Sequence, residues 1–146
     1  MTTSAKRRQH LLVDTSVAVA LTVSDHRDHD ATFRALADRR LGLAGHAAFE
    51  AFSVLTRLPA PARRTPATVA RLLTANFPHT RFLSGQAAAS LLASLESSGI
   101  AGGSVYDALV GAAAAEHGLP LATRDRRALA TYRALEVDVE LIGTTA

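Results

Sequence analysis

The chain has 146 residues, of which 48% are apolar but only 5% aromatic, and it contains no cysteine and no tryptophan. This length suits one domain with a core of Ala, Leu and Val, while the missing cysteines exclude disulfide scaffolds and Cys-based zinc sites. The net charge of +3 comes from Lys6, Arg7 and Arg8, because the remaining 13 basic and 13 acidic residues balance.

After a basic tail over residues 1–9, strands and helices are predicted to alternate along a domain over residues 10–146. Short apolar runs predict buried strands, and longer runs with helical spacing predict helices. The predicted strands cover residues 10–13, 41–44, 81–83, 119–122 and 137–142, and the predicted helices cover residues 17–21, 25–40, 46–58, 66–77, 84–97, 104–117 and 125–135. This alternation predicts a single α/β domain, in which a central parallel sheet of four to five short strands has helices on both faces.

No apolar stretch approaches the length of a membrane span, and the apolar run after the tail is too short for a signal peptide. We therefore expect a cytoplasmic protein with no membrane segment. Three prolines between residues 59 and 66 predict a loop there, because proline breaks helical and strand periodicity.

Four acidic residues stand where an apolar chain has little need of them. Asp14 closes the first predicted strand, Glu50 interrupts an apolar helix, Asp107 lies in the first turn of another, and Asp125 follows the strand over residues 119–122. In parallel sheets the working site lies beyond the carboxyl ends of the strands. Gathered there, four carboxylates would repel one another and stay ionised only around a cation. Hard oxygen ligands select Mg²⁺ or Mn²⁺, metals that suit phosphoryl chemistry.

Each acid alone also has a structural explanation. Asp14 and Asp125 could each cap the helix that follows, and Asp107 could complete a capping box with Ser104. Glu50 could simply face water. Any single acid is more easily explained in this way, but the four together favour a functional site.

Small hydroxyl groups and arginines accompany these acids. Ser16 and Thr123 lie beside Asp14 and Asp125, where they could hold a metal-bound water or a phosphate oxygen. Gly111, one turn beyond Asp107, predicts either the close approach of another element or tight core packing. Arginine clusters that could contact RNA, or simply form a solvated surface, are Arg39-Arg40, Arg63-Arg64 and Arg124 with Arg126 and Arg127.

The order of these motifs resembles the PIN domain, and within it the VapC ribonuclease toxins of bacterial toxin–antitoxin pairs. The resemblance spans residues 11–142 and rests on Val13-Asp14-Thr15-Ser16, on Glu50 within a helix, on Tyr106-Asp107-Ala108-Leu109 and on Leu121-Ala122-Thr123-Arg124-Asp125. Asp14, Glu50, Asp107 and Asp125 match the family's acidic positions, and Thr123 matches its hydroxyl position. The resemblance implies a Mg²⁺-dependent endoribonuclease, usually a homodimer, that a small antitoxin neutralises.

The expected reaction is hydrolysis of phosphodiester bonds in a structured cellular RNA, either tRNA or rRNA, which would inhibit translation. The four acids would bind the metal, and Asp14 or Glu50 would orient the attacking water. The alternative is a catalytically weak module that binds RNA or a partner and keeps a vestigial metal site. Cleavage of RNA with Mg²⁺ but not with EDTA would separate the two.

Other classes lack residues that they need. Receiver domains and P-loop proteins need a well-placed lysine, and the only lysine, Lys6, precedes the first strand. A haloacid-dehalogenase-like phosphatase would have an acid at residue 16, which is Ser. His26 and His29 have possible metal spacing, but the acidic residues around them are typical of a solvated helix start.

Overall fold

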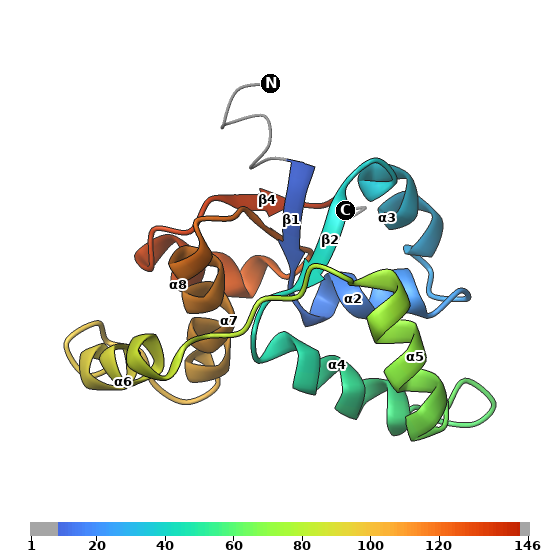
Figure 1. Cartoon of the computed structure of the whole chain (residues 1–146), viewed down its shortest axis with the longest axis horizontal. Helices are drawn as coiled ribbons and strands as arrows, with labels where there is room; N and C mark the ends of the chain where they lie inside the picture. Colours follow the sequence, from blue (N-terminus) through green and yellow to red (C-terminus); the bar gives the residue numbers. More distant parts are fainter. Residues whose placement is uncertain (1–8, 144–146) are drawn as a thin grey trace.

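The structure, a computed structural model, describes residues 9–143, so the predicted tail lies almost wholly outside the described residues. Its centre is a four-stranded parallel sheet in the order β2-β1-β3-β4 (Figure 1). The strands are β1 (His10–Val13), β2 (Arg40–Leu43), β3 (Leu121–Thr123) and β4 (Val139–Leu141). At the end of β1, Val13 lies opposite Leu43 on one side and Ala122 on the other. The predicted α/β fold with a parallel sheet is therefore confirmed.

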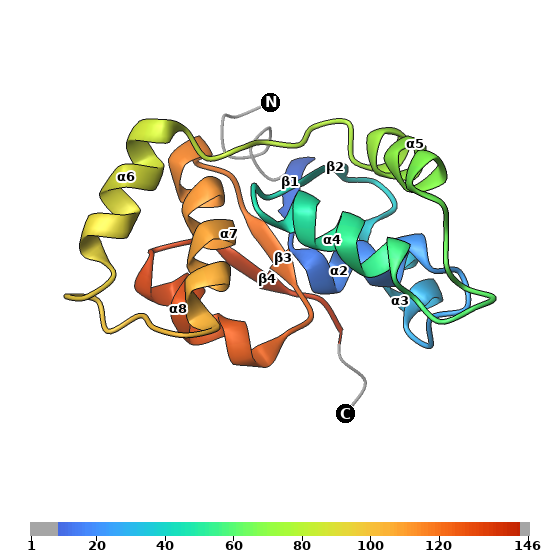
Figure 2. The same cartoon turned by 90° about the horizontal axis from the view of Figure 1, so that it is seen from below.

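Helices flank the sheet in two groups, which Figures 1 and 2 show on opposite sides of the molecule. One group comprises α2 (Thr15–Thr22), α3 (His29–Leu36), α4 (Ala47–Thr56) and α5 (Pro66–Asn76). The other comprises α6 (Gly85–Ser94), α7 (Ser104–His117), the 3₁₀ helix η1 (Arg126–Ala128) and α8 (Leu129–Ala134). In residues 9–143, no helix is both long and apolar enough to cross a membrane.

The side chains of β1 alternate between two cores. Leu11 and Val13 pack into the core beneath α2, whereas Leu12 packs with Leu121 and Tyr132 beneath α7 and α8. Successive residues of a strand point to opposite faces, so a strand covered on both sides must be apolar throughout. This explains why residues 11–13 read as a continuous apolar run.

Two predicted elements differ most from those observed, and several others differ by a few residues at their ends. The helix predicted over residues 25–40 spans only His29–Leu36, because residues 23–28 form turns and Arg40 already pairs with β1. The strand predicted over residues 81–83 is wrong, since Arg81 makes only an isolated bridge to Ala44 and the chain then leaves the edge of β2. Phe82 is 55% exposed, so no apolar face there holds a strand against the sheet.

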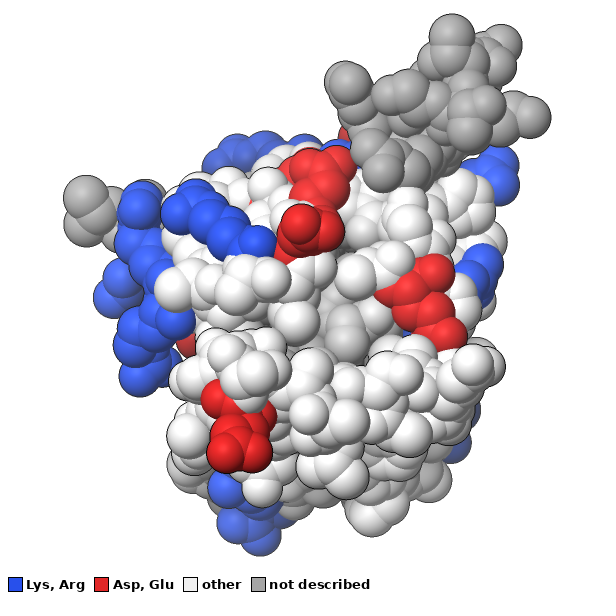
Figure 3. Space-filling model, turned by 90° about the vertical axis from the view of Figure 1, so that its left-hand side faces the viewer, with Lys and Arg blue, Asp and Glu red and all other residues white. Residues whose placement is uncertain are grey.

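Charged side chains are unevenly spread over the surface. Figure 3 shows the side that bears α6, where the lower part is mostly uncharged apart from separate acidic patches, and Lys and Arg lie mainly at the edges of the view. The sequence of α6, GQAAASLLAS, has no charged residue.

Candidate active site

Three donors hold Asp14 at the end of β1, two from the start of α2 and one from α8. Its Oδ1 accepts hydrogen bonds from Ser16 Oγ at 2.6 Å and from the backbone amide of Val17 at 3.3 Å, and its Oδ2 accepts one from Tyr132 Oη at 2.9 Å. The bond from Val17 makes Asp14 the N-cap of α2, as its structural explanation requires. Capping alone does not explain why the side chain is only 4% exposed. Burial raises the pKa of Asp14, and the hydrogen bonds from Ser16, Thr123 and Tyr132 oppose that rise.

Tyr132 is a site residue that sequence reasoning missed. Its side chain comes from α8, is 1% exposed, and donates its phenolic proton to Asp14. Burial and then the charge of Asp14 raise the pKa of Tyr132, so the phenol keeps this proton. The only sequence signal was Gly111. A Cβ built there would lie 3.0 Å from Tyr132 Cδ1 and 3.1 Å from Leu135 Cδ1, so this glycine lets α8 approach α7 closely.

Glu50 and Asp107 are half-buried and share the field of the other acids. Burial raises the pKa of Glu50; the charge of His46 lowers it and that of Asp14 raises it. Burial also raises the pKa of Asp107, followed by the charges of Asp125, Glu50 and Asp14. The fold therefore places Asp107 within the electrostatic influence of the other three predicted acids, and Glu50 within that of Asp14.

Asp107 is not part of a capping box. Helix α7 begins at Ser104, its N-cap is Gly103, and no side chain makes a capping hydrogen bond there. The capping explanation for Asp107 is thus wrong. Helix capping therefore does not account for Asp107, which leaves a role in the site as its explanation.

Asp125 sits just beyond β3. Its Oδ1 accepts from the backbone amide of Arg127 at 3.0 Å and from Arg127 Nε at 3.3 Å, so it does cap η1. The amide of Asp125 donates to Thr123 Oγ1 at 3.0 Å, and the Thr123 side chain is fully buried. The two predicted residues are therefore fixed to each other at the carboxyl end of β3.

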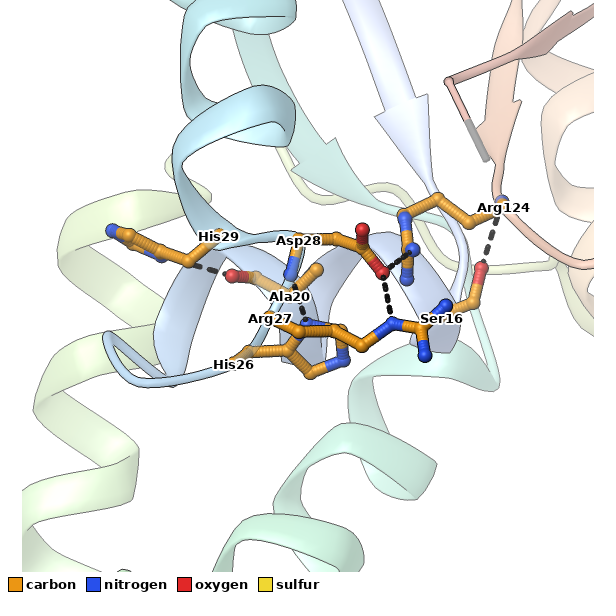
Figure 4. Close-up of polar contacts among 7 residues, drawn as sticks. All are labelled: Ser16, Ala20, His26, Arg27, Asp28, His29 and Arg124. Atoms are coloured by element: carbon orange, nitrogen blue, oxygen red, sulfur yellow. Dashed lines mark hydrogen bonds and ion pairs between the residues drawn. The ribbon is translucent and has the colours of Figure 1, made fainter. Parts of the chain in front are cut away.

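Ser16 links the loop after β3 to Asp14, and Figure 4 shows the contact between Ser16 and Arg124 that forms one half of this link. The backbone amide of Arg124 donates to Ser16 Oγ at 2.9 Å, and this hydroxyl in turn donates to Asp14. The guanidinium of Arg124 pairs with Asp28, and the two side chains are 12% and 8% exposed. These contacts favour a structural role for Arg124 over the RNA contact that was predicted for it.

The other predicted RNA-binding arginines lie further out. Arg63 Nε donates to the carbonyl of Leu58 at 2.8 Å, and Arg64 Nη1 donates to that of Ala62 at 2.5 Å, both in the loop after α4. Glu50 lies in the first turn of that helix, so this loop follows its opposite end. Arg126 is exposed directly after Asp125. An RNA contact for these three residues stays a prediction.

The donor chemistry of the site fits a hard divalent cation. The four acids offer only oxygen ligands, and their mutual repulsion is the kind that a bound cation relieves. The four carboxylates lie further apart than the ligands of a bound metal would. Between residues 9 and 143, no three His, Asp or Glu side chains are grouped closely enough to hold a metal ion. The side chains would therefore have to draw together around Mg²⁺ or Mn²⁺.

Comparison with known sequences gives a consistent result. The sequence profile of the PIN domain matches residues 11–134. The chain is 49% identical over 129 residues to Ribonuclease VapC27 of Mycobacterium tuberculosis, a match that covers 88% of this chain and 94% of that protein. It is 44% identical over 131 residues to Ribonuclease VapC40 of the same species, covering 88% and 96%.

Two solved structures share the fold. One is VapBC2 from Rickettsia felis bound to a DNA fragment from its promoter, with a TM-score of 0.65 and 12% identity over 90% of this chain and 98% of that one. The other is FitAB bound to an IR36 DNA fragment, with a TM-score of 0.63 and 16% identity over 90% and 94%. At such low identity the likeness is one of fold.

Proposed function

The chain belongs to the PIN-domain family and is of the VapC type, and from this premise we propose that it is a metal-dependent endoribonuclease toxin with a cognate antitoxin. The observation that carries the proposal is the convergence of Asp14, Glu50, Asp107 and Asp125, each of which comes from a different part of the chain. Two relatives that align over most of their length are named ribonucleases.

The four acids would hold Mg²⁺, for which Mn²⁺ can substitute. When bound, such a metal neutralises charge on the scissile phosphate and lowers the pKa of a water. Oδ1 of Asp14 already accepts two hydrogen bonds and Oδ2 accepts one from Tyr132, so Oδ2 is the oxygen with a further lone pair to offer a metal. Glu50 is less buried than Asp14, which makes Glu50 the better acceptor for a hydrogen bond from the attacking water.

The substrate that we propose is a structured cellular RNA, tRNA or rRNA, whose cleavage inhibits translation. We expect the active protein to be a homodimer. The partner would be a small antitoxin that presents Arg or Lys to the acidic site, because a cationic plug neutralises buried carboxylates as a metal does. Co-expression with the product of the neighbouring upstream gene tests this, and a complex that cleaves RNA as fast as the free protein would argue against it.

A second candidate function is a weak RNA- or partner-binding module with a vestigial metal site. The open spacing of the acids in residues 9–143 is the observation that favours it. Such a protein would bind RNA without cutting it.

One experiment separates these functions. Purified protein should cleave total cellular RNA with Mg²⁺ and not with EDTA, and Asp14→Asn should abolish cleavage while keeping the fold. Glu96→Gln, an exposed acid after α6, is the matched control and should cleave like the wild type. Near-normal cleavage by Asp14→Asn would refute the proposed site.

A further inference from the structure

Four rings form an exposed cluster, which we call the aromatic platform: His46, Phe49, Phe82 and Tyr106. The rings of His46 and Tyr106 are stacked, with centroids 5.5 Å apart and planes 23° apart. Phe49 lies 6.3 Å from His46 and 6.1 Å from Phe82, measured between centroids. The side chains of Phe49, Phe82 and Tyr106 are 65%, 55% and 53% exposed.

What sets these rings apart is that they are grouped, because Phe33 and Phe52 are exposed too, by 58% and 37%. The chain has only five Phe and two Tyr, and three of these seven lie together in the platform. Single exposed apolar residues are ordinary on a protein surface, but a contiguous set marks a site of interaction. The platform is therefore a candidate surface for binding a ligand.

The platform adjoins the acidic site through two helices. Phe49 immediately precedes Glu50 on α4, and Tyr106 immediately precedes Asp107 on α7, where Figures 1 and 2 show the two helices on either side of the middle of the molecule. A hollow of about 320 Å³ runs along α4 beside the platform, within the usual size of a small-molecule site. It is lined by His46, Phe49, Glu50, Ser53, Val54 and Arg57.

Charge decides which ligand suits this surface. The carboxylates of Glu50 and Asp107 repel a phosphate backbone, so contacts to phosphate alone cannot hold RNA close to them. Ring faces attract unpaired bases by stacking, which needs no protein charge. Arg57, at the far end of the hollow from His46, is placed to meet a phosphate beyond the carboxylates.

We infer that the aromatic platform stacks unpaired bases of the RNA next to the bond that is cut. This inference rests on the proposed ribonuclease function and deepens it by assigning a binding site for single-stranded RNA. Because every base has a π-face, the platform selects unpaired strands over duplexes more than one sequence over another. It would favour cleavage in loops, where bases are free to turn outward.

The absence of tryptophan allows a direct test. Phe49→Trp keeps an aromatic ring and makes it the sole indole of the protein. Adding single-stranded oligo(A) RNA in EDTA should quench its fluorescence, and duplex RNA should do so weakly. Phe33→Trp, at a 58% exposed position on α3, is the matched control and should show no quenching.

Affinity supplies the second measurement. Phe49→Ala and Tyr106→Ala should each weaken binding of fluorescein-labelled oligo(A) by about fivefold or more, the lower end for loss of one base–aromatic stack. Phe49→Leu keeps the apolar bulk without the ring and should weaken binding similarly. The salt dependence of binding should not change, because none of these variants removes a charge.

Three results would overturn the inference: no quenching of Phe49→Trp, equal quenching of Phe33→Trp, or wild-type affinity in Phe49→Ala and Tyr106→Ala. Light scattering identifies the competing role, since variants that split a dimer but bind RNA normally would make the platform a contact between copies. Cleavage by the wild type is measured alongside. Wild-type protein that neither cuts nor binds RNA refutes the proposed function, whereas active wild type with unaffected variants refutes only the platform.

Discussion

Tyr132 holds the most buried carboxylate of the site from a position 118 residues away in the chain. Removing its hydroxyl leaves the packing of the ring unchanged but takes one donor from Asp14 Oδ2. Since that hydrogen bond opposes the rise in the pKa of Asp14, its loss should raise this pKa further. Tyr132 is thus a positioning residue for Asp14.

We expect Tyr132→Phe to reduce RNA cleavage by about 10- to 100-fold, the effect of losing a hydrogen bond to a charged group. The lower limb of the pH–rate profile should also move to higher pH, because Asp14 would lose its proton at a higher pH. A purely structural role would change neither the profile nor the rate at a given folded concentration. Cleavage measured across pH in Mg²⁺ checks both, and an unchanged profile would remove Tyr132 from the site.

No local pattern could have revealed Tyr132. The four acids could be predicted because each interrupts or ends an apolar run, and their order along the chain follows a known family. Tyr132 reads as an ordinary core aromatic, and its contact with Asp14 depends on how α8 packs on α7 over Gly111. Contacts of this kind arise only from the assembled fold.

At the scale of elements, the buried pair of Asp28 and Arg124 joins the N-terminus of α3 to the loop after β3 (Figure 4). Arg27 Nε also donates to Asp28, at 3.4 Å. Arg124 directly follows Thr123, the last residue of β3, and directly precedes Asp125. The pair therefore ties one wall of the acidic site to α3.

Asp28→Asn should destabilise the protein by about 3 kcal/mol, because it leaves the buried guanidinium of Arg124 without its counter-charge. Urea unfolding measures this, and the double variant Asp28→Leu/Arg124→Met should lose less because no buried charge remains. A loss below 1 kcal/mol in the single variant would show that water reaches the pair.

Element types could be predicted from hydrophobic spacing, but their ends could not. The start of α5 at Pro66 followed from Thr65, which caps it through the amide of Thr68. The helix predicted from residue 25 begins at His29, and its N-cap Asp28 makes no side-chain capping hydrogen bond, so the nearby acids did not indicate the start. Its end was set by the pairing of β2 with β1, a contact between distant segments.

At the scale of the whole molecule, the acidic site couples stability to pH. The folded-state pKa values of Asp14, Glu50 and Asp107 are raised, so protonation favours the fold. Their contribution is fully present below about pH 4, the ordinary carboxyl value, and is lost as the pH rises through the raised values.

Without metal, Asp14→Asn should therefore have a higher Tm than the wild type at pH 7, by roughly 4 °C for each kcal/mol of repulsion and desolvation removed. The difference should shrink towards pH 4. Mg²⁺ or Mn²⁺ should raise the Tm of the wild type by mass action and that of Asp14→Asn much less. Thermal unfolding with and without EDTA checks this, and an equal rise in both proteins would place the metal elsewhere.

Because Gly111 has no side chain, adding one there should have an effect that a genetic selection can detect. If the protein poisons its host, cells that survive its expression carry inactivating mutations, and substitutions of the four acids are the obvious class. Gly111→Ala should form another, because a methyl group 3.0 Å from the ring of Tyr132 would push the phenol away from Asp14 without altering any charge. Sequencing survivors should recover substitutions at residue 111 in protein that still accumulates and still binds its antitoxin. Such alleles would encode an inactive protein that still forms a complex with its antitoxin.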